Sequence, residues 1–213
     1  MNEQNHRPIT PPYRIETDRF VIRCYHPKDA PILRKSVIES VEELKPWLPW
    51  AWLEPQTVEE RMEFIRFRRS QFDRDEDFVY GIFDKEETEV LGGTGLHTRR
   101  GKDAFEIGYW VNTNHARKGI ATEASVAMTI IGLGYCKRDR IEVRCDVENK
   151  VSAMIPERLG FTKEAVRRRI DKDVDGTFRD TAIYTLFLHE FSDWAHRGLP
   201  LRGYDAAGRK VIG

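Results

Sequence analysis

The sequence contains little cysteine and no long apolar stretch. Its three cysteines, Cys24, Cys136 and Cys145, are odd in number and have no close pairing, which excludes a disulfide framework and a zinc ribbon. No segment approaches the run of about 18 apolar residues that crosses a membrane, and residues 1–12 lack the apolar core of a signal peptide. We therefore expect a cytoplasmic protein with no bound metal and no membrane contact.

An excess of charge of either sign is also missing. Lys and Arg together number 35, as do Asp and Glu, so the formal net charge is zero. A general nucleic-acid binder needs an excess of basic charge, so direct binding to nucleic acid is not expected. The 213 residues are enough for one domain with an ample core, and no internal repeat divides them.

The two commonest phosphate-binding motifs are absent as well: there is neither a Gly-x-Gly-x-x-Gly after a strand nor the Gly-Lys-Ser/Thr of a P-loop. Residues 105–124, FEIGYWVNTNHARKGIATEA, instead contain a predicted buried strand, a polar turn and a short basic loop, and a helical pattern begins at Thr122. The first turn of a helix has unpaired N–H groups and the positive end of its dipole. Gly119 lets the backbone approach a ligand, and Arg117 and Lys118 add positive charge. This stretch predicts an anion site suited to a pyrophosphate.

Periodicity and breaker residues predict the remaining elements. Thr57 and Glu60 form a capping box for a helix over 57–73, and Gly160 ends a helix over 150–159. Residues 46–52, PWLPWAW, are too irregular for a helix or a central strand. Strands are predicted over 17–25, 78–84, 90–97, 105–111, 140–145, 161–171 and 180–188.

The loop 116–121, ARKGIA, resembles the acetyl-CoA loop of the GNAT acetyltransferases, Arg/Gln-x-x-Gly-x-Gly/Ala. Gly119 and Ala121 match its fourth and sixth positions, whereas Ala116 stands at the first position in place of Arg or Gln. The Asn-x-x-Ser spacing at 149–152, followed by Leu-Gly-Phe, resembles a second segment of the same family, although the Asn and Ser alone would suit an ordinary helix cap.

The RimJ/RimL branch of this family, the ribosomal-protein N-terminal acetyltransferases, is similar in further segments. These are TDRFVIR at 17–23, PWLPW at 46–50, EIGYW at 106–110 and GIATEA at 119–124. The resemblance covers a GNAT domain over 15–188. It leaves residues 1–14 as a flexible N-terminal arm and 189–213 as a C-terminal extension of unknown role.

The resemblance implies an α/β (α+β) GNAT fold, a mixed and strongly twisted sheet of six or seven strands flanked by helices. Its fourth and fifth strands, here 105–111 and 140–145, splay apart, and the pantetheine arm of acetyl-CoA enters the gap and pairs with the backbone as an added strand does. The residues implied in cofactor binding are Trp110, Val111, Asn112, Arg117, Lys118, Gly119, Ile120, Ala121, Thr122 and Asn149, of which the last either touches the pantetheine or only caps its helix.

Acetyl transfer to an amine needs a deprotonated nucleophile and a proton for the leaving thiolate. Glu106, at the edge of a strand, is the candidate base, acting through water, or else it is a surface or salt-bridged glutamate that begins a strand. Ser152 is the candidate donor near the thiolate, preferably through a hydrogen bond to sulfur, or else only a capping residue. His97 either borders the acceptor or is incidental. Three tryptophans either wall the acceptor pocket or fill the protein core: Trp47, Trp50 and Trp52.

The sequence therefore predicts an acetyl-CoA-dependent N-acetyltransferase in which a primary amine attacks directly in a ternary complex. The branch resemblance favours a protein N-terminal amine over a small amine such as an amino acid, polyamine or antibiotic. A non-catalytic acyl-CoA-binding regulator is the alternative from another class, and a homodimer stays open. The basic run over 167–169 either attracts an acidic protein or is a solvated face.

Overall fold

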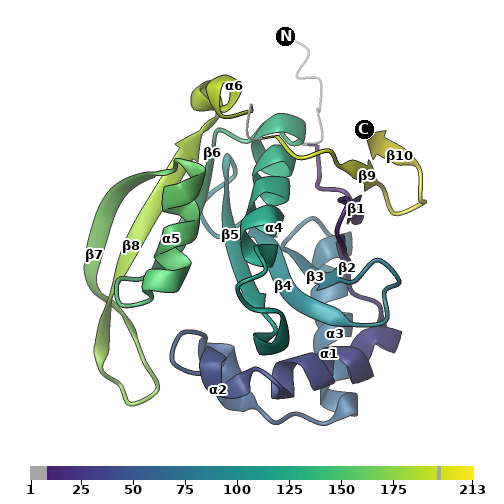
Figure 1. Cartoon of the computed structure of the whole chain (residues 1–213), viewed down its shortest axis with the longest axis vertical. Coiled ribbons are helices and arrows are strands. Elements are labelled where there is room, and N and C mark those ends of the chain that lie inside the picture. Colours follow the sequence, from purple (N-terminus) through teal and green to yellow (C-terminus); the bar gives the residue numbers. More distant parts are fainter. Residues whose placement is uncertain (1–8, 196–197) are drawn as a thin grey trace.

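The computed structural model describes residues 9–195 and 198–213, and these form one large sheet with helices on both faces (Figure 1). The first eight residues of the predicted N-terminal arm lie outside the described residues. The strands are β1 (Arg14–Glu16), β2 (Val21–Cys24), β3 (Phe78–Phe83), β4 (Val90–His97), β5 (Ala104–Val111), β6 (Arg140–Asp146), β7 (Thr162–Lys172), β8 (Phe178–Phe187), β9 (Arg202–Tyr204) and β10 (Lys210–Ile212). The α-helices are α1 (Ala30–Ile38), α2 (Val41–Leu44), α3 (Val58–Asp73), α4 (Ile120–Thr129), α5 (Lys150–Leu159) and α6 (Phe191–Trp194).

The sheet has ten strands within the described residues, in the order β10-β9-β1-β2-β3-β4-β5-β6-β8-β7, so the prediction of six or seven strands was too low. One cause is the first predicted strand, 17–25, which in fact begins at Val21. The Thr17 hydroxyl oxygen accepts the N–H groups of Arg19 and Phe20, and this turn separates β1 from β2. The other cause is the segment 189–213, whose β9 pairs antiparallel with β1.

Side chains of the central strands alternate between two hydrophobic clusters, as expected of a sheet covered on both faces. On β2 and β3, Ile22, Tyr80 and Ile82 belong to the large cluster that includes α4, while Val21 and Phe83 pack with α1 and α3. Both sheet faces are therefore buried, which holds the central strands β3, β4 and β5 in place as a rigid support for the site.

The helix ends follow the sequence closely. Thr57 and Glu60 form the predicted capping box of α3. Asn149 caps α5 by accepting the Ser152 N–H at 3.0 Å, and Gly160 ends this helix with φ +79°. The long helix predicted from Thr122 begins two residues earlier, and its last part, Ile130–Tyr135, is a π-helical segment.

The strands β5 and β6 are parallel and separate along their length, which confirms the predicted splay. They pair over 104–107 and 140–143, and the register ends there although both strands continue. All other neighbouring strands of the sheet are antiparallel. A strand edge is thus left unpaired at the carboxyl end of β5, directly before the loop that leads into α4.

Candidate active site

The loop between β5 and α4 has the geometry of an anion cradle. Gly119 is the N-cap of α4 with φ +77°, and Arg117 also has a positive φ of +63°. Within the described residues, none of the N–H groups of 117–122 donates a hydrogen bond to protein. Six consecutive unpaired donors at a helix N-terminus fit the pyrophosphate of a coenzyme, which supplies the acceptor oxygens that these groups lack.

Arg19, which the sequence reasoning missed, lies against this loop. It donates to the Lys118 carbonyl oxygen and to the Glu123 carboxylate, both at 2.7 Å, and its guanidinium is 3.7 Å from where a Cβ on Gly119 would be. An arginine from the beginning of the chain thus adds charge to the loop whose first position is Ala116 in place of Arg or Gln. No local spacing connects Arg19 to the loop, because the two are about a hundred residues apart in the sequence.

Asn112, which was expected to contact the cofactor, is bonded within the protein through both its backbone and its side chain. Its N–H donates to the Leu91 carbonyl on β4 at 2.9 Å, and its carbonyl accepts the His115 N–H at 2.8 Å. Its side chain is fully buried, and the amide nitrogen donates to Ser36 at 3.0 Å and to Glu39 at 2.9 Å. Asn112 therefore ties the end of β5 to α1.

Of the three residues 110–112, whose backbone was expected to face the gap between β5 and β6, Val111 is the one that does so. The Trp110 carbonyl faces β4, since a Cβ added to Gly92 would be 2.3 Å from its oxygen. Because successive residues of a strand direct their N–H and C=O groups to opposite edges, Val111 directs its own toward the open gap. The ring of Trp110 packs edge-to-face on Trp50, with centroids 5.9 Å apart.

Tyr109, a second residue that sequence reasoning missed, spans the gap between β5 and α5. Its hydroxyl donates to the Ser152 carbonyl at 3.0 Å and accepts the Ser152 hydroxyl at 3.2 Å. Burial raises the pKa of Tyr109 above its ordinary value, although the hydrogen bond from Ser152 acts in the opposite direction. The phenol therefore stays protonated at neutral pH and can act as a proton donor.

Glu106 does not lie at the edge of a strand but inside the sheet, where it is 5% exposed and opposite His97 in the register of β4. Its two carboxylate oxygens accept hydrogen bonds from Arg99 and Arg100. Burial alone would raise the pKa of Glu106, but these two guanidinium groups outweigh it, so the pKa lies below its ordinary value. A carboxylate held in this way is a weak base.

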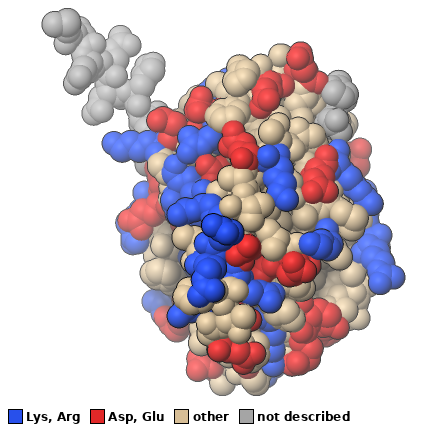
Figure 2. Space-filling view, turned by 90° about the vertical axis from the view of Figure 1, so that its left-hand side faces the viewer, with Lys and Arg blue, Asp and Glu red and all other residues tan. Residues whose placement is uncertain are grey.

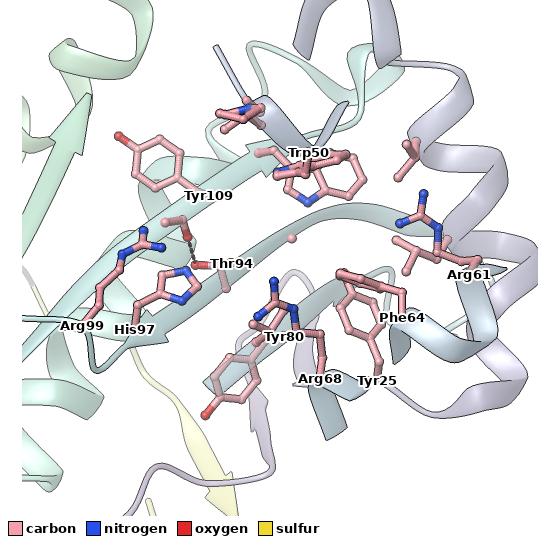
Figure 3. Close-up of a pocket in the computed structure, with 18 residues that line it drawn as sticks. Tyr25, Trp50, Arg61, Phe64, Arg68, Tyr80, Thr94, His97, Arg99 and Tyr109 are labelled. Atoms are coloured by element: carbon pink, nitrogen blue, oxygen red, sulfur yellow. Dashed lines mark hydrogen bonds between the residues drawn. The ribbon is translucent and has the colours of Figure 1, made fainter. Parts of the chain in front are cut away.

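A cavity of about 300 Å³ lies on the face of β3, β4 and β5 that α1 and α3 cover (Figure 3). Of the three tryptophans expected at the acceptor, Trp50 lines it. Trp47 and Trp52 do not, and with 37% and 45% exposure they are not core residues either. The cavity is lined by Tyr25, Leu33, Val37, Leu48, Pro49, Trp50, Arg61, Phe64, Arg68, Val79, Tyr80, Gly93, Thr94, His97, Arg99, Gly108, Tyr109 and Trp110.

His97 borders this cavity, and its Nδ1 is 2.8 Å from the Asp77 carboxylate. Asp77 therefore fixes the orientation of the imidazole ring. Within residues 9–195 and 198–213, no group of three or more His, Cys, Asp or Glu side chains is arranged to hold a metal, and no helix is long and apolar enough to cross a bilayer.

The basic run over 167–169 lies on β7, which is exposed along its whole length at the edge of the sheet. Figure 2, which views the molecule from the side of β7 and β8, shows basic and acidic side chains interspersed over this face. Arg169 itself lies over the Phe178 ring at 4.1 Å. The run is therefore part of a mixed, solvated face and does not form a patch of one sign.

An opened pair of parallel strands, an unpaired helix N-terminus at its end and a walled cavity beside it together define an acyl-CoA-dependent acyltransferase. Residues 19–162 match the family model described as Acetyltransferase (GNAT) domain. Over 193 residues the chain is 30% identical to the ribosomal protein uS5-alanine N-acetyltransferase of Escherichia coli (strain K12), covering 85% of this chain and 94% of that protein.

Solved structures agree with this assignment of the fold. RimL, a ribosomal L7/L12 alpha-N-protein acetyltransferase in complex with coenzyme A, superposes with a TM-score of 0.71 at 21% identity, over 81% of this chain and 96% of that one. The ribosomal-protein-S5-alanine acetyltransferase from Vibrio fischeri superposes with a TM-score of 0.72 at 20% identity, over 85% and 98% of the two chains. The chain belongs to the GNAT family and is an acetyl-CoA-dependent N-acetyltransferase.

Proposed function

We propose that this enzyme acetylates the N-terminal amine of a protein, which attacks directly while both substrates are bound. The observation that carries the proposal is the position of Tyr109, which lines the cavity and whose hydroxyl also bonds to Ser152 across the strand gap. An amine in the cavity and a thioester in the gap would meet at this side chain. The relative in Escherichia coli, named for a ribosomal-protein alanine, supports a protein acceptor.

Acetyl-CoA, when bound, supplies an activated acetyl group and a thiolate leaving group. The residues that would hold its pyrophosphate are the N–H groups over 117–122, with Arg19 beside them. The backbone of Val111 would pair with the pantetheine amides, while Asn149 keeps the capping role that the structure gives it. Proximity of the two substrates accounts for much of the acceleration.

Tyr109 is the proton donor in this proposal, and Ser152 orients its hydroxyl. Tyr109 is placed to protonate a leaving thiolate because its hydroxyl stays protonated and both lines the cavity and bonds to Ser152, although its raised pKa makes it a weaker acid than an exposed phenol. Glu106, the base predicted from the sequence, does not line the cavity, whereas its hydrogen-bond partner Arg99 does. We assign it a positioning role for Arg99.

The test is release of free thiol from acetyl-CoA with N-terminal peptides, amino acids, polyamines and aminoglycosides as acceptors. Peptide-dependent release that Tyr109→Phe lowers at least tenfold is the expected result. Release with small amines alone would make the enzyme a small-molecule acetyltransferase, and binding of acetyl-CoA without release from any acceptor would favour a regulatory protein.

A further inference from the structure

The charges that line the cavity are all of one sign. Among its lining residues are three arginines, Arg61, Arg68 and Arg99, and one histidine, but no aspartate or glutamate. Figure 3 shows the arginines around the space between Trp50 and His97. Acetyl transfer itself does not require such a wall, because the transferred group is neutral and the reactive acceptor is a neutral amine.

Two of these arginines are fixed on the same face of α3. Arg61 and Arg68 are seven residues apart, which is two helical turns, and Phe64 lies between them. Both guanidinium groups lie over the Phe64 ring, at 5.3 Å and 5.4 Å from its centroid. This stacking holds two positive charges beside the cavity in a defined geometry.

The carboxylates that partner these arginines are absent from the cavity wall. Glu54, only 1% exposed at its side chain, binds Arg61, and Asp77 is 3.4 Å from Arg68. Asp77 is shared with His97, just as Glu106 is shared between Arg99 and Arg100, so each neutralises its arginine only in part. The Arg68 side chain is 33% exposed, so its interactions are screened less than on the surface, whereas Arg99 is 56% exposed and is screened more.

The stability of the fold alone does not explain why arginines line this cavity. The Nε atoms of Arg61 and Arg68 are buried and have no hydrogen-bond partner in the described part of the chain. An unpaired buried donor costs free energy, and apolar side chains would cover the same sheet face without that cost. The arginines are therefore better explained by a ligand than by packing.

We propose that the acceptor is an amine that carries a carboxylate close to the amine, such as a protein N-terminus with Asp or Glu as its second residue. This substrate class rests on the proposed function and specifies the acceptor of the same site. The carboxylate accepts charge-assisted hydrogen bonds from Arg68 and Arg99 at the cavity, which an arginine fork suits. The same charges disfavour an ammonium group, so the amine is bound in its neutral, nucleophilic form without a strong base in the wall.

The experiment measures binding separately from turnover. Three peptides that differ only at the second residue, Ala-Glu, Ala-Gln and Ala-Lys, are titrated by calorimetry into the protein with coenzyme A present, and free glutamate and its diamide, which carries no carboxylate, are titrated in parallel. The Glu peptide is expected to bind about tenfold to a hundredfold more tightly than the Gln peptide, the range of one hydrogen bond to a charged group. A preference seen with free glutamate but with no peptide would identify a small aminocarboxylate as the source of the same chemistry.

Matched variants identify the residue responsible. Arg68→Gln is expected to reduce the Glu-over-Gln ratio to within about twofold of one, and Arg68→Glu to make the Lys peptide the tightest of the three. Arg66→Gln is the control, because Arg66 lies on the same helix, is 63% exposed and does not line the cavity. A melting curve for each variant confirms that it is folded.

Equal binding of the acidic and neutral ligands by the unmodified protein would overturn the proposal, as would a ratio that survives Arg68→Gln unchanged. Failure of the proposed function has a different signature. In that case the acidic peptide binds in an Arg68-dependent manner, yet no thiol is released from acetyl-CoA, and the anion-binding site is supported without the reaction.

Discussion

Replacing Gly119 by valine tests the anion cradle, and the chain provides a matched control for it. Gly119 has φ +77° at the start of α4, and Gly176 has φ +79° in the turn between β7 and β8. Neither position is crowded: a Cβ at Gly119 would meet only Arg19 at 3.7 Å, and one at Gly176 would meet nothing within 4 Å. Valine at either site therefore introduces backbone strain without a steric clash.

The strain at each site costs about 1–3 kcal/mol of the free energy of unfolding. For a chain of this size that corresponds to a melting temperature lower by about 2–12 °C, for Gly119→Val and Gly176→Val alike. Only Gly119→Val turns the N–H groups over 117–122 away from a bound pyrophosphate. Each charge-assisted hydrogen bond lost there raises the Kd for acetyl-CoA by about tenfold to a hundredfold.

Calorimetry with acetyl-CoA and thermal melts of both variants are the assay. Gly119→Asn is a third variant with an intermediate expectation, because asparagine tolerates a positive φ better than valine does. Binding of acetyl-CoA by Gly119→Val as tight as that of the unmodified protein would refute the anion cradle, as would an equal loss of affinity in Gly176→Val and Gly119→Val.

Four further changes test individual residues. Tyr109→Phe should lower kcat for thiol release about a hundredfold with little change in the KM for acetyl-CoA, whereas a pure loss of affinity would contradict its role as proton donor. Arg19→Ala removes an exposed charge worth about 1 kcal/mol, so the Kd for coenzyme A measured by calorimetry should rise about fivefold. Asn112→Ala should cost about 1–3 kcal/mol in denaturant unfolding yet leave acetyl-CoA affinity unchanged in the folded protein. The lowered pKa of Glu106 contributes stability that is present above its unfolded pKa and lost as the pH falls through the folded pKa, so Glu106→Gln should destabilise at neutral pH and cease to do so in acid.

Elements with strong local signals could be predicted from the sequence. The capping box of α3, the end of α5 at Gly160 and the loop around Gly119 each depend on residues a few positions apart. The splay of β5 and β6 could be predicted only through the family resemblance, because nothing in either strand alone specifies where their pairing stops.

Features that depend on distant contacts could not be predicted. The strand β9 is only three residues long and is defined by its pairing with β1, at the other end of the chain. Arg19 reaches its loop across the fold, and Tyr109 looks like any aromatic residue of a buried strand until Ser152 lies beside it. Arg61 and Arg68 lie three or four residues from the buried Ile65, so helical spacing places them beside the core, but only the tertiary structure shows that they line a cavity.

The central claim is that an N-terminal amine is acetylated where the strand gap meets the cavity, beside Tyr109. It is tested most directly by incubating the protein with acetyl-CoA and one peptide, Ala-Glu at its start and a lysine further on, and locating the product by mass spectrometry. We expect one acetyl group on the α-amine, with thiol released in equal amount and both formed about a hundredfold more slowly in Tyr109→Phe. Acetylation of the lysine instead, or tight binding of acetyl-CoA with no acetylated peptide, would contradict it.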